Sequence, residues 1–197
     1  MLSPKVQAAL IDISGWCNQD KAELFASHLT NMYSPLCVEI GVFAGRSLII
    51  LGLLLKEKGR GIAVGIDNWS KTAIVEGNES KDMKWYLDKD LEAIYQTCLK
   101  CVTDYEVENF CAVLRLDSYR GANIFGYESI DLLHIDGNHS EKISCRDVEL
   151  FLPKVKRQGV IVFDDINWGT TKKAQALLAK NCILDYQTSH FAAYIKN

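Results

Sequence analysis

Acidic residues stand at the end of each of five short apolar runs in the sequence. In chain order they are Glu39, Asp67, Asp117, Asp136 and the pair Asp164-Asp165. If the runs are parallel strands of one sheet, their carboxyl ends meet at one edge, and these side chains gather there. Gathered carboxylates repel one another unless hydroxyls, amides or a cation compensate them. The pattern therefore predicts a ligand site at that edge.

The loop after the first run is rich in glycine and reads Glu39-Ile-Gly41-Val-Phe-Ala-Gly45-Arg-Ser47. Gly41 and Gly45 let the backbone turn sharply and approach a ligand closely. The helix that follows offers free N–H groups and a positive dipole end. An acid ahead of the first glycine suits an ammonium or sulfonium group better than a pyrophosphate. A plain glycine turn explains the loop equally well.

Two further positions suit a nucleoside. Asp67 lies about twenty residues after the glycine loop, where a carboxylate meets ribose hydroxyls in nucleoside-binding sheets. Asp117 and Ser118 serve an adenine edge or simply cap the next helix. Trp69 and Trp168 are candidates for the wall of a pocket, or ordinary core or rim aromatic residues.

The fourth and fifth runs carry groups suited to metal and proton chemistry. Asp136, Asp164 and Asp165 converge if their strands are neighbours, and three carboxylates suit a hard ion such as Mg²⁺. His139 is a candidate for proton transfer, because imidazole titrates near neutral pH. His134 lies inside the run and is predicted to be a core histidine whose hydrogen bonds are satisfied.

Strand and helix patterns alternate along the chain after Pro35. The predicted strands are Leu36–Ile40, Gly61–Ile66, Cys111–Leu116, Ile130–Ile135, Gly159–Phe163, Ile183–Gln187 and Phe191–Lys196. The predicted helices are Ser47–Lys58, Met83–Val102, a short one from Tyr119, Ser140–Leu152 and Thr171–Lys180, after a helical preface over residues 1–34. Continuously apolar strands indicate a parallel sheet covered by helices. We predict one α/β domain over residues 1–197, with a doubly wound core over residues 35–197.

Composition excludes several classes of protein. The chain has 197 residues, 48% of them apolar, a formal net charge of −3 and a pI near 5.8. A nucleic-acid partner is not expected, because no basic excess is present. The sequence contains no secretory signal and no apolar stretch long enough for a bilayer. Seven cysteines without a disulfide or zinc pattern indicate reduced thiols, so we expect a cytoplasmic protein without a membrane partner.

Four motifs together resemble class I S-adenosylmethionine-dependent methyltransferases. They are the glycine loop from Glu39 to Ser47, the turn Gly65-Ile-Asp-Asn-Trp69, the segment Leu132-Leu-His-Ile-Asp-Gly-Asn-His139 and the segment Gly159-Val-Ile-Val-Phe-Asp-Asp165. The similarity covers about two thirds of the chain, from Leu36 to Phe163, and is greatest to the small single-domain group near the macrolide-sugar and catechol O-methyltransferases. It implies a mostly parallel seven-stranded, Rossmann-like sheet with the last strand antiparallel.

The resemblance also implies roles for individual residues. The expected cofactor-binding residues are Glu39, Gly41, Gly45, Ser47, Asp67, Trp69, Asp117, Ser118 and Asp136. Asp136, Asp164 and Asp165 match the metal-binding acids of the sugar-modifying members, and His139 with Asp136 matches the catalytic positions. The chain is shorter than its relatives and has no long substrate-binding insertion.

These residues predict methyl transfer from S-adenosylmethionine to a hydroxyl of a small molecule, with help from Mg²⁺ or another divalent cation. The segment Asn68–Lys84 is expected to act as a lid, and the preface as a second lid or as the face of a homodimer. Three alternatives stay open. They are a methyltransferase that works without metal, a nucleotide-sugar transferase that binds a metal with the same acids, and a non-catalytic module that binds the cofactor.

Overall fold

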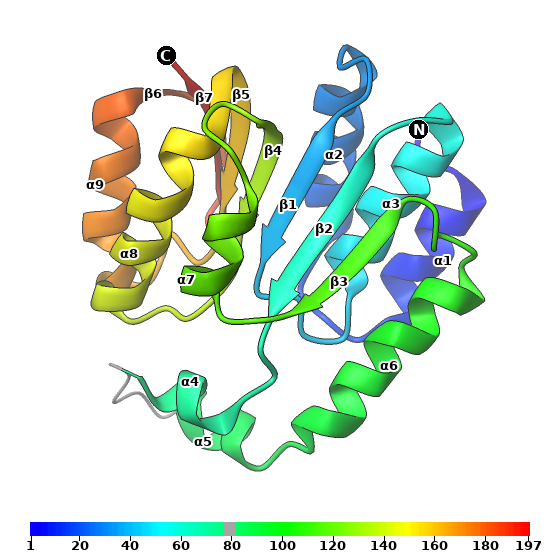
Figure 1. The fold of residues 1–197 in the computed structure, drawn as a ribbon, viewed down its shortest axis with the longest axis horizontal. Helices are drawn as coiled ribbons and strands as arrows, with labels where there is room; N and C mark the ends of the chain where they lie inside the picture. Colours follow the sequence, from blue (N-terminus) through cyan, green and yellow to red (C-terminus); the bar gives the residue numbers. More distant parts are fainter. Residues whose placement is uncertain (77–81) are drawn as a thin grey trace.

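Seven strands form a single sheet in the computed structural model, which describes residues 1–76 and 82–197 (Figure 1). Their order is β3-β2-β1-β4-β5-β7-β6. The strands are β1 (Leu36–Ile40), β2 (Ile62–Asp67), β3 (Cys111–Arg115), β4 (Ile130–Ile135), β5 (Val155–Phe163), β6 (Cys182–Gln187) and β7 (Ala192–Lys196). Strands β1 to β5 pair in parallel, whereas β7 runs antiparallel to both β5 and β6. The predicted fold class is confirmed.

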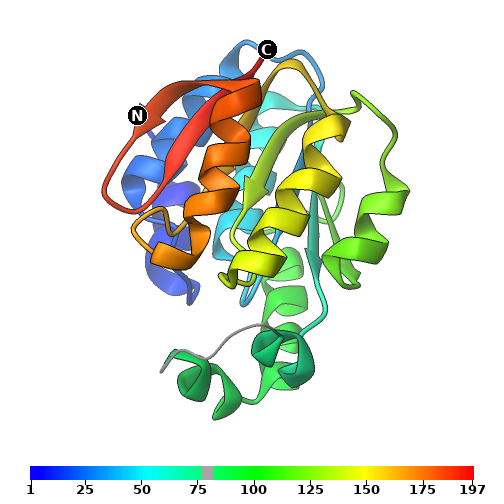
Figure 2. The same ribbon diagram turned by 90° about the vertical axis from the view of Figure 1, so that its left-hand side faces the viewer.

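Helices cover both faces of the sheet (Figures 1 and 2). Those on one face are α1 (Pro4–Asp12), α2 (Gln19–Thr30), α3 (Arg46–Lys58) and α6 (Leu91–Asp104). Those on the other face are α7 (Ser118–Gly121), α8 (Glu141–Phe151) and α9 (Lys172–Asn181). The remaining two, α4 (Lys71–Val75) and α5 (Asp82–Leu87), lie beyond the arrow tips of β2 and β3. This end of the sheet is the edge at which the sequence predicts a site.

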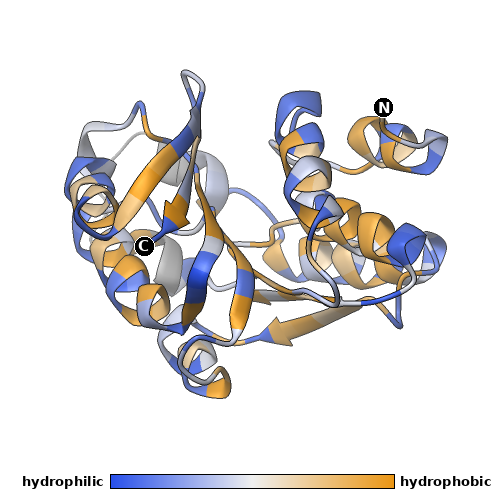
Figure 3. Ribbon diagram, turned by 90° about the horizontal axis from the view of Figure 1, so that it is seen from above, coloured by the Kyte–Doolittle hydropathy of each residue, from blue (hydrophilic) through white to orange (hydrophobic). Residues whose placement is uncertain are grey.

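The central strands β1 and β4 are buried because they carry mostly apolar residues, which are coloured orange along the ribbon (Figure 3). Cys37 and Leu132 belong to the core between the sheet and α3, whereas Val38 and Leu133 belong to the core against α8. Successive residues of a strand point to opposite faces, so an uninterrupted apolar run fills both layers. The two layers hold the carboxyl ends of the strands in a fixed register.

The helix α3 is the most buried helix next to the site. Its residues from Leu48 to Leu51 are fully buried, as the apolar pattern all round predicts. Gly45 precedes the helix with φ of 94° and Gly59 follows it with φ of 75°, conformations that glycine adopts at little cost. The first turn of α3 therefore starts directly behind the glycine loop.

The helical preface packs on α3. Val6 and Ala9 of α1 and Leu24 and Phe25 of α2 join the same core as Leu48 of α3. Both helices of the preface are capped at their N-termini. The side chains of Ser3 and Asn18 accept hydrogen bonds from backbone N–H groups three residues further on. The residues between the two helices reach the carboxyl edge of the sheet, where they join the site described below.

The predicted long helix Met83–Val102 is wrong in one respect, because the structure divides it into α5 and α6. Asp90 caps the start of α6 by accepting a hydrogen bond from the Ala93 N–H at 3.0 Å, and this side-chain bond competes with a continuous helix. The predicted lid Asn68–Lys84 contains α4. Gly77, which belongs to this polar segment, lies outside the described residues.

Candidate active site

Two adjoining cavities lie at the carboxyl edge of the sheet. The first has a volume of about 210 Å³ and opens over the ends of β1, β2 and β4. The second has a volume of about 370 Å³ and lies over the ends of β4 and β5, beside α2. Trp16, Tyr86, Asp136 and His139 line both cavities. A molecule in one cavity therefore meets a molecule in the other at these four side chains.

The glycine loop forms the floor of the first cavity. Gly41 has φ of 85°, and a Cβ atom there would lie 2.1 Å from the Asp136 carbonyl oxygen. Its N–H donates to the Ile66 carbonyl at 3.0 Å, so the loop is tied to β2 while it packs against Asp136, the residue that follows β4. Gly45 does not line the cavity. It begins α3, and a Cβ atom there would lie 2.9 Å from the Cys98 sulfur.

Asp67 holds two loops in place with one carboxylate. Its Oδ2 accepts hydrogen bonds from the N–H groups of Val42 and Phe43, and its Oδ1 accepts one from Trp69 N–H, all between 2.9 and 3.0 Å. Phe43 and Trp69 have φ of 52° and 45°, in the left-handed region that non-glycine residues rarely adopt. Both Asp67 and Trp69 line the first cavity, and Asp67 retains accepting capacity for a ligand hydroxyl.

Glu39 lies beneath the loop rather than in the cavity. Its side chain is fully buried, accepts a hydrogen bond from the Ser47 hydroxyl and lies 2.8 Å from His134 Nδ1. Ser47 lines the first cavity, whereas Glu39 lines neither. The structure thus places Glu39 behind Ser47, and its expected role in cofactor binding stays a prediction.

The far end of the first cavity combines a predicted pair with a residue that the sequence analysis missed. Asp117 accepts a hydrogen bond from Arg120 N–H and so caps α7, and Ser118 donates to Asp147 at 2.5 Å. Burial raises the pKa of Asp147 to about 6. Ile143 and Asp147 lie four residues apart on α8, a spacing that puts them on one helix face, and this was the only available signal.

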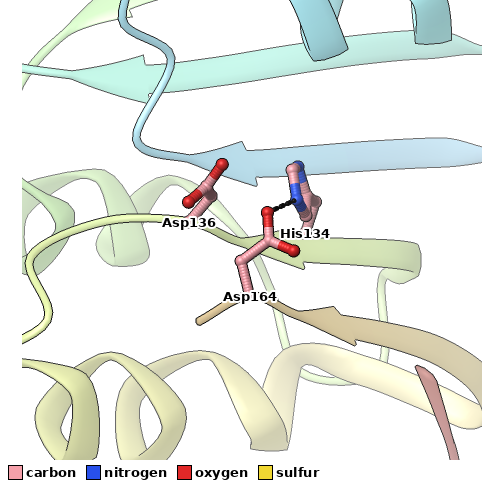
Figure 4. Close-up of side chains that lie close together, drawn as sticks. All are labelled: His134, Asp136 and Asp164. Atoms are coloured by element: carbon pink, nitrogen blue, oxygen red, sulfur yellow. Dashed lines mark hydrogen bonds and ion pairs between the residues drawn. The ribbon is translucent and has the colours of Figure 1, made fainter. Parts of the chain in front are cut away.

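A buried charge network lies under the second cavity (Figure 4). Oδ2 of Asp164 accepts hydrogen bonds from His134 Nε2 at 3.0 Å and from the Lys21 ammonium group. Burial alone would raise the pKa of Asp164, but the positive charges of Lys21 and His134 hold it well below its usual range. Burial opposes the charge on His134 as well, yet Asp164 and Glu39 raise its pKa to about 9. Both nitrogens of His134 are partnered, as predicted.

A second, more open group surrounds His139. Its Nε2 lies 2.7 Å from Asp165 Oδ2 and 3.9 Å from Asp136 Oδ1, and its ring centroid lies 4.8 Å from that of Trp168. Burial opposes the charge on His139, but the two carboxylates outweigh it and raise the pKa to about 10. Burial and the neighbouring Asp164 raise the pKa of Asp136 to about 7. The imidazole is thus held between two acids at the boundary of the cavities.

The predicted metal site does not form as expected. Among the described residues, two groups of three bring ligand atoms within 4.8 Å of one another, namely His134, Asp136, Asp164 and Asp136, His139, Asp165. The three predicted carboxylates are divided between them, because the side chain of Asp164 points inward and that of Asp165 points to His139.

Neither group fits Mg²⁺. In the inner group, both nitrogens of His134 are engaged, and the ammonium of Lys21 already lies on Asp164. In the outer group, Asp165 already pairs with the His139 imidazole at 2.7 Å, and a nitrogen ligand such as His139 is not one that Mg²⁺ prefers. We therefore derive no catalytic step through a metal.

Comparison with known proteins identifies the fold family. A family model described as a methyltransferase domain matches residues 38–166, about two thirds of the chain. The chain belongs to this family. It is a class I S-adenosylmethionine-dependent methyltransferase, and the predicted enzyme class is confirmed. The nucleotide-sugar transferase considered above is set aside. No curated protein matches this methyltransferase significantly in sequence.

Solved structures similar to this methyltransferase confirm the fold. Cofactor-bound Rv0187 from MTB has a TM-score of 0.68 at 13% identity, covering 98% of this chain and 90% of that one. The O-methyltransferase TomG of Streptomyces achromogenes, in complex with SAM, has a TM-score of 0.63 at 14% identity, covering 100% and 92%. An O-methyltransferase of Bacillus cereus in complex with SAH has a TM-score of 0.58 at 14% identity, covering 98% and 87%.

Proposed function

We propose that this methyltransferase transfers the methyl group of S-adenosylmethionine to a hydroxyl oxygen of a small molecule. One observation carries the proposal. The first cavity and the second cavity meet at His139, whose imidazole lies 2.7 Å from Asp165. A hydroxyl is a poor nucleophile until it loses its proton, so a proton acceptor at the junction of donor and acceptor cavities is the group that O-methylation needs.

The residues that line the first cavity suit the chemistry of S-adenosylmethionine. Its lining includes most of the predicted cofactor residues, namely Gly41, Ser47, Asp67, Trp69, Asp117, Ser118 and Asp136. The backbone at Gly41, which has no side chain in the way, would bind the methionine end of the cofactor. Asp67 would bind the ribose hydroxyls, and Ser118 with Asp147 would bind the adenine edge. When bound, the cofactor supplies an electrophilic methyl group on a positive sulfonium. The carboxylate of Asp136, which faces both cavities, complements that charge.

The proton step belongs to His139. Its Nδ1 takes the hydroxyl proton of the acceptor. Its Nε2 keeps the other ring proton and donates it to Asp165, which fixes the ring and stabilises the resulting imidazolium. The acceptor oxygen then displaces the methyl group in line, so its electron pair forms the new O–C bond while the S–C bond pair stays on sulfur. Holding both reactants at one wall supplies the proximity that this displacement requires.

The second cavity favours a flat acceptor. Aromatic side chains make up much of its lining, namely Trp16, Trp85, Tyr86, Trp168 and Phe191. Aromatic faces stack on planar rings and on the apolar faces of sugars. A phenol or a sugar hydroxyl therefore fits, and the names of TomG and of the Bacillus cereus enzyme as O-methyltransferases support oxygen as the methylated atom.

A combined binding and turnover measurement tests the proposal. We expect calorimetry to detect binding of S-adenosylhomocysteine, and labelled S-adenosylmethionine to give an O-methyl product from at least one of a panel of phenols and sugars. Products methylated only on nitrogen or carbon would contradict the proposal. Binding of the cofactor without any turnover would favour the non-catalytic module instead.

The homodimer and the cytoplasmic location stay predictions. The homodimer expected from the sequence is tested by analytical ultracentrifugation of the purified protein. Within the described residues, no helix is long and apolar enough to cross a membrane. The cytoplasmic location stays an expectation from the sequence alone.

A further inference from the structure

A lysine of the helical preface lies among Asp136, Asp164 and Asp165 at the carboxyl edge of the sheet. Lys21 is in the first turn of α2 and is only 3% exposed, and its ammonium binds Asp164, which is 143 residues away in the chain. It lines the second cavity together with Asp136, His139 and Asp165. The acid cluster therefore contains a cation supplied by the chain itself.

The ammonium of Lys21 has donors to spare. A lysine ammonium carries three N–H donors, and Nζ makes a single hydrogen bond, to Asp164, within the described part of the chain. Its other near neighbour is the ring of Phe191, 5.5 Å from Nζ to the centroid. Burying a lysine is costly and is seldom tolerated without full pairing. The remaining donors are thus available to an oxygen atom in the cavity that Lys21 lines.

The charge of Lys21 acts on both inner acids. The ammonium lowers the pKa of Asp164 and also that of Asp136, the carboxylate shared by the two cavities. A divalent ion between the same carboxylates would have the same effect and would also bind an acceptor oxygen. In this chain, that position is taken by an ammonium fixed to the preface.

We propose that Lys21 is a catalytic residue, which replaces a divalent ion by donating a hydrogen bond to the acceptor oxygen during methyl transfer. The inference rests on the proposed O-methylation. The hydroxyl proton goes to His139, the oxygen electron pair forms the O–C bond, and the S–C bond pair remains on sulfur. Lys21 keeps its protons throughout and stabilises the negative charge that develops on oxygen.

The first test asks whether the ammonium and a metal compete for one place. Binding of Mn²⁺ is followed by electron paramagnetic resonance in the wild-type protein and in Lys21→Ala. We expect no stoichiometric binding to the wild type and binding to the variant, which frees Asp136 and Asp164. Methylation by the wild type should also persist in excess EDTA. Stoichiometric Mn²⁺ binding to the wild type, or activity lost in EDTA and restored by Mg²⁺, would overturn the proposal.

The second test measures the charge that the acceptor oxygen meets. The probe is 4-nitrophenol, whose oxyanion absorbs visible light, titrated in the complex with S-adenosylhomocysteine. In the wild type, we expect the ionisation constant of bound nitrophenol to be at least about tenfold larger than in the double variant K21M/D164N. The double variant removes both partners of the ion pair and so leaves no uncompensated buried charge.

The outcomes separate the two proposals. An ionisation constant that is equal in the wild type and in K21M/D164N shows that the ion pair is merely structural. This result overturns the catalytic role of Lys21 and leaves the proposed O-methylation untouched. Nitrophenol that neither binds nor is methylated counts against the phenol acceptor of the proposed function, whereas the Mn²⁺ measurement still decides on Lys21. Lys173→Met is the matched control, because Lys173 is 71% exposed and pairs with Glu141 away from both cavities.

Discussion

His139 is the residue on which the proposed chemistry depends most directly. Replacing it with alanine should leave binding of S-adenosylhomocysteine nearly unchanged and slow methyl transfer by about 10²–10⁴-fold, because a positioned proton acceptor contributes that much. Calorimetry measures the first effect and single-turnover assays the second. His28→Ala is the control, since His28 lies 3.3 Å from Asp185 and lines neither cavity. A lost heat of binding would instead assign His139 to the cofactor site.

The pH dependence of the reaction tests the partner of His139. Asp136 and Asp165 raise the pKa of His139 to about 10, so its basic form, and with it the rate, should increase as the pH rises toward 10. Asp165→Asn removes one of the two negative charges, and the pKa of His139 should fall. In a plot of kcat/KM for the acceptor against pH, the increase should therefore occur at lower pH in Asp165→Asn than in the wild type. The kcat/KM that the variant reaches at high pH should also be lower. An unmoved profile would show that Asp165 does not act on the titrating group.

The residues that the sequence could predict share a positional rule, and the missed ones do not. Asp67, Asp117 and Asp136 lie at strand ends, so topology alone brings them to one edge. Lys21 and Asp147 reach the same site from helices, and no spacing in the sequence connects them with their respective partners, Asp164 and Ser118. The direction of a side chain is also not set by topology, which explains why Asp164 and Asp165 diverge.

At the scale of elements, the glycine loop follows β1 and packs tightly against the residue that follows β4. Gly41→Ala would place a Cβ atom 2.1 Å from the Asp136 carbonyl oxygen in addition to straining φ of 85°. We expect a loss of unfolding free energy well above the about 1–2 kcal/mol that strain in the left-handed region costs, together with weakened S-adenosylhomocysteine binding. Urea unfolding and calorimetry measure the two effects.

Gly59 offers a matched control for that substitution. It ends α3 with φ of 75°, and a Cβ atom there would meet nothing within 4 Å. Gly59→Ala should therefore cost only the conformational strain and leave ligand binding unchanged. Equal destabilisation by the two substitutions would show that contact with β4 at Gly41 has no energetic weight.

Helices and strands were predictable where hydrophobic patterning is continuous. The strand Ile130–Ile135 and the buried helix α3 follow directly from apolar runs. The break between α5 and α6 did not follow, because the apolar spacing continues across it and only the side chain of Asp90 selects a new helix start. Short-range hydrogen bonds of this kind compete with periodicity and are decided by the tertiary setting.

At the scale of the whole molecule, the helical preface belongs to the core and to the wall of the second cavity. The sequence shows its apolar faces but not the surface they pack on, so a lid and a dimer face were both expected. The structure places those faces on α3, and the preface contributes Trp16, Asn18 and Lys21 to the second cavity. The family match begins only at residue 38, so these lining residues of the second cavity lie outside the matched region.

The buried network beneath the second cavity makes the stability of the whole protein depend on pH. The folded protein raises the pKa of His134 to about 9, from 6.5, so it binds the proton more tightly than the unfolded chain. This contribution to stability is complete below about pH 6.5 and is lost as the pH rises through 9. The measured quantity is the unfolding free energy of the wild type minus that of His134→Gln, obtained by urea unfolding. This difference should fall by about 3 kcal/mol between pH 6.5 and 9.

A second histidine provides an internal check of the sign. Burial lowers the pKa of His28, so the folded protein binds this proton less tightly than the unfolded chain does. The stability of the wild type relative to His28→Gln should therefore decrease as the pH falls below 6.5, the reverse of the trend for His134. If the difference in unfolding free energy between the wild type and His134→Gln stays constant from pH 6.5 to 9, Asp164 and Glu39 do not hold a charged imidazole. The positive charge under the second cavity would then come from Lys21 alone.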